Sequence, residues 1–224
     1  MERVVAIGTG RASSEGAVAL AETYPEVWAA VGVHPHDADG WSARDAGWIA
    51  ELARHPRVVA IGECGLDYFR DHSARDAQAR AFAAQIGLAR DAGLPVVVHT
   101  RDADRDTLDL LAREAEGHPV ILHCFSMAAR AAEVAERGYY TSLAGQVTYP
   151  NAADLRSAVR ALPAQGLLLE TDSPYLAPVP RRGRPNRPAN VAHTLRFVAG
   201  LRDMAPEALD ALTTANADRV LWPA

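Results

Sequence analysis

The sequence contains no lysine, so all 23 basic residues among its 224 are arginines. It has only two cysteines, Cys64 and Cys124, which are too few for a disulfide framework. No apolar run approaches the roughly 20 residues of a membrane helix, and the first residues lack the basic, apolar and cleavage regions of a signal peptide. We therefore expect a protein of the reducing cytoplasm with no membrane partner.

The sequence also has no excess of positive charge, because its formal net charge is −5. This argues against a protein that coats nucleic acid through bulk charge, and any contact with DNA needs a local basic patch instead. The apolar content of 49% and the charged content of 23% are ordinary for a soluble globular protein.

Seven short runs rich in β-branched residues alternate with Ala- and Leu-rich helical stretches. The runs are continuously apolar, as expected for parallel strands that are covered on both faces. Their starts are about 27 residues apart, the length of a strand–helix unit. The predicted strands are residues 4–9, 27–33, 58–64, 95–100, 120–125, 139–144 and 167–172.

The alternation predicts an α/β fold, a (β/α)₈ TIM barrel with seven parallel strands visible and the first βα unit missing. No linker divides the chain, so we expect one domain over residues 1–224. Ser73 is the expected N-cap of a helix that buries Phe82, Ile86 and Ala89, and Gly93 is the expected end of that helix.

Four reactive side chains fall at or near the carboxyl ends of four different strands. They are Glu63, His99, His123 and Asp172. In a parallel barrel these ends converge on one face, where active sites lie. Two imidazoles and two carboxylates there predict a site for a divalent metal, Zn²⁺ or Mn²⁺, with Mg²⁺ as a further candidate.

Three nearby residues extend this site. His34 follows the second strand and is the better candidate for a substrate contact, whereas His36 is expected to face water. Glu170 precedes Asp172 by two residues and shares its face, so it either tunes the site or braces it. Cys64 and Cys124 each follow an expected ligand by one residue, and strand alternation turns them toward the helix layer as inert core residues.

Arginines supply a candidate phosphate-binding surface on the same face. Arg101 follows His99 by two residues, and Arg181, Arg182, Arg184 and Arg187 cluster in the loop after the last strand. A solvated surface loop is the competing interpretation of that cluster.

Several motifs together resemble the TatD-type metal-dependent deoxyribonucleases over essentially the whole chain. They are Gly32-Val-His-Pro-His36, Gly62-Glu-Cys-Gly-Leu-Asp-Tyr68, Leu94-Pro-Val-Val-Val-His-Thr-Arg-Asp102, His123-Cys-Phe-Ser126, Glu170-Thr-Asp-Ser-Pro-Tyr-Leu176, Pro180-Arg-Arg-Gly-Arg-Pro-Asn-Arg-Pro188 and Asn216-Ala-Asp-Arg-Val220.

The resemblance implies a (β/α)₈ barrel that hydrolyses DNA phosphodiester bonds with two divalent metals. Glu63 would bridge the metals, His99 and His123 would complete one of them, and Asp172 would belong to the other. Asp172 or a neighbour such as Glu170 would orient or deprotonate the attacking water, while His34, Arg101 and the arginine loop would position phosphate.

The sequence departs from the family in one respect. The family opens on a strand with an Asp-x-His-x-His-type motif, and that motif is absent here. We therefore expect one retained metal position (Glu63, His99, His123), weak or no turnover, and self-association over an open barrel seam. A misplaced gene start is our hypothesis for the missing motif.

Two other functions stay open on the sequence alone. One is hydrolysis of C–O or C–N bonds by a deacylase or amidohydrolase-like enzyme, although the absence of lysine excludes the carboxylated lysine that many such enzymes use. The other is a non-catalytic remnant that binds nucleic acid.

Overall fold

The computed structural model describes residues 2–223, and the chain divides into two compact units. The first unit ends at Ile121 and the second begins at Leu122. Each unit is built from strands that alternate with helices, as the sequence pattern predicts.

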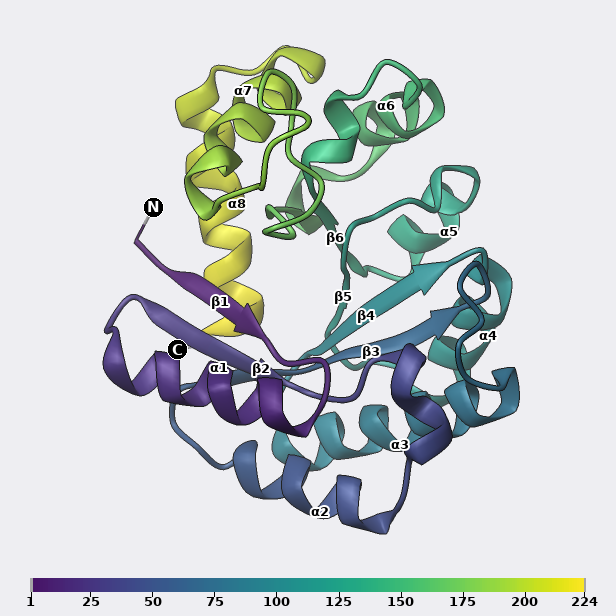
Figure 1. Ribbon diagram of the computed structural model, residues 1–224. Helices are drawn as coiled ribbons and strands as arrows, with labels where there is room; N and C mark the ends of the chain where they lie inside the picture. The colour runs from purple at the N-terminus through teal and green to yellow at the C-terminus, as the bar shows by residue number, and fades with distance from the viewer. Residues whose placement is uncertain (1, 224) are drawn as a thin grey trace. The chain divides into compact units, whose positions relative to one another are not determined.

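The first unit contains four parallel strands that pair in chain order, β1 with β2, β2 with β3, and β3 with β4. Helices α1, α2 and α3 lie along one side of these strands (Figure 1). The elements are β1 (Val4–Ile7), α1 (Arg11–Thr23), β2 (Val27–Val31), the 3₁₀ turn η1 (Pro35–Gly40), α2 (Ala43–Leu52), β3 (Val58–Asp67), α3 (Arg75–Ala92), β4 (Val96–Arg101) and α4 (Asp104–Glu114).

Helix α3 packs against β3 with one apolar face, because Phe82, Ile86 and Ala89 recur at helical spacing and are fully buried. Gly93 ends the helix in the left-handed conformation with φ 65°, which confirms the predicted stop. The predicted N-cap at Ser73 is wrong. The helix begins two residues later, and the Ser73 hydroxyl instead donates to the His36 carbonyl and accepts from the Asp39 N–H.

The second unit pairs β6 with β7 in parallel, and helices α7 and α8 pack against β7. The buried Asn216 side chain on α8 donates to the carbonyls of Ala164 and Leu167 at the start of β7. Its elements are α5 (Ala131–Glu136), β6 (Tyr140–Leu143), α6 (Ala153–Ala161), β7 (Leu167–Leu169), α7 (Val191–Leu201), α8 (Pro206–Leu221) and the 3₁₀ turns η2 (Ala128–Arg130), η3 (Gly145–Thr148), η4 (Ala164–Gly166) and η5 (Pro188–Asn190); β5 (Val120–Leu122) spans the boundary between the units.

Five strands, β1, β2, β5, β6 and β7, end earlier than the sequence predicts, and the difference is largest, three residues, in β5 and β7. Strand β5 stops at Leu122 rather than residue 125, and β7 stops at Leu169 rather than residue 172. Cys124 (φ 44°) and Asp172 (φ 55°) adopt the left-handed conformation, which an extended strand cannot contain. His123, Glu170 and Asp172 therefore lie on the turns that follow the strands.

Among residues 2–223, no helix has both the length and the apolar character needed to cross a membrane.

Strands β3 and β4 approach so closely at Gly65 that a side chain there would collide with the His99 carbonyl. A Cβ atom would lie 1.9 Å from that oxygen, and Gly65 has φ +143°. We expect Gly65→Ala to lower the free energy of unfolding by about 2 kcal/mol or more in a urea titration. Gly87→Ala on α3 is the matched control, because a Cβ there meets nothing within 4 Å and should stabilise by roughly 0.5–1 kcal/mol. Equal effects of the two substitutions would contradict the close approach.

Candidate functional site

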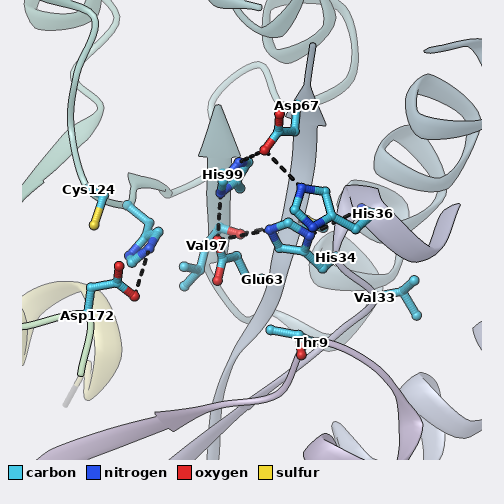
Figure 2. Close-up of polar contacts among 12 residues, drawn as sticks. Thr9, Val33, His34, His36, Glu63, Asp67, Val97, His99, Cys124 and Asp172 are labelled. Carbon is cyan, nitrogen blue, oxygen red and sulfur yellow. Dashed lines mark hydrogen bonds and ion pairs between the residues drawn. The ribbon is translucent and has the colours of Figure 1, made fainter. Parts of the chain in front are cut away.

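Glu63 on β3 and His99 on β4 lie side by side in the first unit. His99 Nδ1 is 2.8 Å from Glu63 Oε1, and His34 Nε2 is 3.6 Å from the same oxygen. Figure 2 shows the three side chains directed toward one another. One ligand atom from each lies within 4.8 Å of the other two, so this is a candidate cation site in which the hydrogen bonds of each side chain decide which of the three can be ligands.

Asp67, at the end of β3, lies within hydrogen-bonding distance of two histidine rings. Its Oδ2 is 3.0 Å from His36 Nε2 and 3.1 Å from His99 Nε2 (Figure 2). Its Oδ1 accepts the backbone N–H groups of Phe69 and Arg70. Burial alone would raise the pKa of Asp67, but the hydrogen bonds from Arg70, His36 and His99 outweigh it and hold this pKa at about 2.

Asp67 was missed in the sequence analysis, although a signal for it was present. Residues 63 and 67 are four apart on a strand and therefore share a face, so both carboxylates point the same way. The expectation that His36 faces water is also wrong. The His36 ring contacts the Asp67 carboxylate, and its side chain is only 34% exposed.

His34 is arranged as a hydrogen-bond donor. Its Nδ1 accepts the backbone N–H of His36 at 3.2 Å, so in the neutral ring the proton sits on Nε2 and points toward Glu63. The preceding Val33 is fixed by the buried Gln85 of α3, whose amide accepts from the Val33 N–H and donates to the Val33 carbonyl. A donor at this position suits a phosphate oxygen better than a metal.

His99 has the opposite character, because the ionised Asp67 accepts from its Nε2. Its Nδ1 faces a Glu63 oxygen, and a cation bound there would let Nδ1 act as a ligand while Nε2 donates to Asp67. Ion–donor lengths of about 2.0–2.2 Å place neighbouring donors roughly 3 Å apart, which agrees with the 2.8 Å between these two atoms. The pair fits a divalent metal.

The second unit holds a matching histidine and carboxylate. Glu170 Oε2 is 2.9 Å from His123 Nδ1, and Glu170 Oε1 accepts the Cys124 N–H at 2.6 Å. Burial alone would raise the pKa of Glu170, but the interactions with His123, Cys124 and Ser142 lower it. Because the Nδ1 proton is donated to Glu170, His123 Nε2 is the nitrogen that faces Asp172, 3.8 Å from its Oδ1.

Both cysteines stay protonated. Burial raises the pKa of Cys64, whose fully buried sulfur donates to the Val97 carbonyl, and this confirms its expected place in the core. Burial and the Glu170 charge raise the pKa of Cys124. The expectation that Cys124 turns toward the helices is wrong, because its sulfur lies within 4.8 Å of ligand atoms of His123 and Glu170. The left-handed turn at Cys124 interrupts the strand alternation.

The arginine loop is tied to the turn that carries Asp172. The buried Asn186 side chain donates to the carbonyls of Thr171 and Tyr175, which flank Asp172. The loop has four exposed arginines, Arg181, Arg182, Arg184 and Arg187. The Arg182 guanidinium lies 4.2 Å from the centre of the Tyr149 ring. In the first unit, Arg101 ends β4 and is also exposed.

A model of the TatD related DNase family matches residues 1–222. The chain belongs to this family. The uncharacterized metal-dependent hydrolase YabD of Bacillus subtilis (strain 168) is 40% identical to it over 222 residues, which are 98% of this chain and 87% of YabD. The 3'-5' ssDNA/RNA exonuclease TatD of Salmonella typhimurium is 40% identical over 217 residues, 94% of this chain and 84% of that protein.

The solved structure of YJJV, a TatD homologue from Escherichia coli K12, matches 99% of this chain and 86% of its own, with a TM-score of 0.93 and 28% identity. This match confirms the predicted α/β barrel class with its seven visible strands, and the family match confirms the resemblance.

The hydrogen bonds predict opposite tautomers for two site histidines. We expect long-range ¹H–¹⁵N NMR spectra at about pH 8 to show neutral His34 protonated on Nε2 and neutral His123 protonated on Nδ1. His118 is an internal reference, because its Nε2 lies 2.9 Å from the Leu94 carbonyl and should carry the proton. The same tautomer at His34 and His123 would contradict this arrangement.

Proposed function

We propose that this chain is a metal-dependent exonuclease that hydrolyses phosphodiester bonds of single-stranded nucleic acid. The proposal rests on family membership over residues 1–222 together with relatives named 3'-5' ssDNA/RNA exonuclease at 40% identity. The observation that carries it in this chain is the Glu63–His99 pair, whose donor atoms fit a cation, together with the exposed Arg101 two residues after His99, which suits phosphate.

We propose Glu63 and His99 in the first unit, and His123 and Asp172 in the second, as the metal ligands. Nitrogen and carboxylate donors favour Zn²⁺ or Mn²⁺, with Mg²⁺ as a weaker candidate. A bound divalent ion lowers the pKa of water and offsets charge on the phosphate. The number of ions stays a prediction, and metal analysis after dialysis tests it.

The roles of the other residues follow from their hydrogen bonds. His34 presents Nε2–H to a phosphate oxygen, and Asp172 accepts the proton of the attacking water. Arg101, Arg181, Arg182 and Arg184 contact the phosphate backbone through their guanidinium groups. Glu170 was expected either to tune or to brace the site, and its bonds to His123 and Cys124 favour bracing.

Three further expectations stay predictions: the missing first βα unit, the cytoplasmic location and self-association. A sizing measurement tests self-association, and a chain restored with an upstream His-x-His strand tests the missing unit.

The main test uses single-stranded DNA carrying a label at either end. Because weak turnover is expected of this chain, we expect slow Mn²⁺-dependent shortening from the 3' end that stops on addition of a chelator and resumes when the metal is restored. Glu63→Gln should lower kcat/KM by about 100-fold or more, because the ligand charge is lost. Glu136→Gln, an exposed glutamate on α5, is the matched control and should change nothing.

Inactivity toward nucleic acid with activity on an aminoacyl ester or an amide would favour the deacylase alternative. Binding of nucleic acid without hydrolysis, in this chain and in the restored chain, would favour the non-catalytic remnant.

A separate prediction concerns the brace behind His123. Glu170→Gln keeps one hydrogen-bond acceptor but removes the charge, so we expect the affinity for Zn²⁺ to fall by roughly 10–100-fold. Competition with a chromophoric chelator measures this change, and Glu136→Gln again serves as the control. Unchanged affinity would show that Glu170 does not support a metal ligand.

A further inference from the structure

The turn after β3 presents an aromatic ring two residues after Asp67, the carboxylate that contacts His99. Phe69 is 53% exposed, whereas burial is the usual place for a ring of this size. Its neighbour Tyr68 is less exposed, and the Tyr68 hydroxyl is already engaged as a donor to Asp106. Phe69 is therefore the ring of this turn that a ligand can reach.

Two guanidinium groups lie over the Phe69 ring. The Arg101 Cζ is 3.8 Å from the ring centre, and the Arg70 Cζ is 5.6 Å from it. The nearby carboxylate of Asp71 is paired with Arg75, so it does not neutralise either group. A ring that is 53% exposed and has two guanidinium groups against it suits a ligand with both a flat ring and a negative charge.

The position of this ring is fixed relative to the candidate metal ligands. Asp67 Oδ1 accepts the N–H groups of Phe69 and Arg70, while Asp67 Oδ2 holds His99. Strand pairing adds a second constraint, since Asp67 is the register partner of Arg101 and the Tyr68 N–H donates to the Arg101 carbonyl. These hydrogen bonds fix the backbone of the turn relative to His99 and to the end of β4.

We propose that Phe69, Arg70 and Arg101 form a stacking site for one base of a single-stranded nucleic acid. The base stacks on Phe69, and Arg101 and Arg70 contact the adjoining phosphates. This inference deepens the proposed function and rests on it for the identity of the ligand. A duplex does not fit, because its bases are not free to stack on a side chain.

The experiment measures binding by fluorescence anisotropy in EDTA and in Mn²⁺, with two labelled single strands of equal length. One strand carries bases and the other is abasic throughout, so both carry the same phosphates. Phe69→Ala should weaken binding of the base-bearing strand by about tenfold or more and leave the abasic strand unchanged. Phe69→Trp should retain the affinity, and circular dichroism checks that each variant is folded.

Matched controls separate stacking from surface area and charge. Tyr24 is 49% exposed at the end of α1, which precedes β2 and so lies at the opposite ends of the strands, and Tyr24→Ala should have no effect. Arg101→Ala should weaken both strands and reduce the salt dependence of binding. Arg80→Ala removes an exposed arginine of α3 and should change neither.

Three outcomes would overturn the stacking site: wild-type protein that binds neither strand in either condition, an equal loss for both strands in Phe69→Ala, or duplex binding that depends on Phe69. Hydrolysis is scored separately on the wild type. Binding that depends on Phe69 without hydrolysis would contradict the proposed function and support the stacking site. Hydrolysis by the wild type, with no effect of Phe69→Ala on binding, would support the proposed function and contradict the stacking site.

Discussion

The first unit depends on one ionised carboxylate at the end of β3. Asp67 accepts four hydrogen bonds, two from the histidine rings of His36 and His99 and two from the backbone of the turn that follows. A carboxylate that is buried without donors would be destabilising, so these four donors both satisfy Asp67 and are oriented by it. A single charge thereby fixes the direction of the His99 lone pair and the position of Phe69.

Helix α3 supports this arrangement through two buried amides. Gln78 accepts the Asp67 N–H and donates to the Asp67 carbonyl, and Gln85 does the same for Val33. The two glutamines are seven residues apart, so they lie on one face of the helix two turns from each other. They satisfy backbone groups at the points where β2 and β3 leave the sheet, and this sets where His34 and Asp67 project.

The fold could be predicted from the sequence because it depends on patterns that are local. Continuous apolar runs indicated the seven strands, and Gly93 marked the end of α3 correctly. The details that failed depend on contacts between distant residues. Ser73 bonds η1 rather than capping α3, and the left-handed turns at Cys124 and Asp172 shorten their strands. Gln78 and Gln85 went unassigned because the backbone groups they bond lie on other elements.

The same hydrogen bonds divide the histidines by role in a way that residue type alone does not. His99 and His123 each donate one ring N–H to a carboxylate, Asp67 or Glu170, so the other nitrogen is available as a ligand. His34 accepts a backbone N–H on Nδ1, so its other nitrogen carries the proton. The hydrogen bonds thus support the roles that the sequence suggested, with His99 and His123 as lone-pair donors for a cation and His34 as a proton donor for an anion.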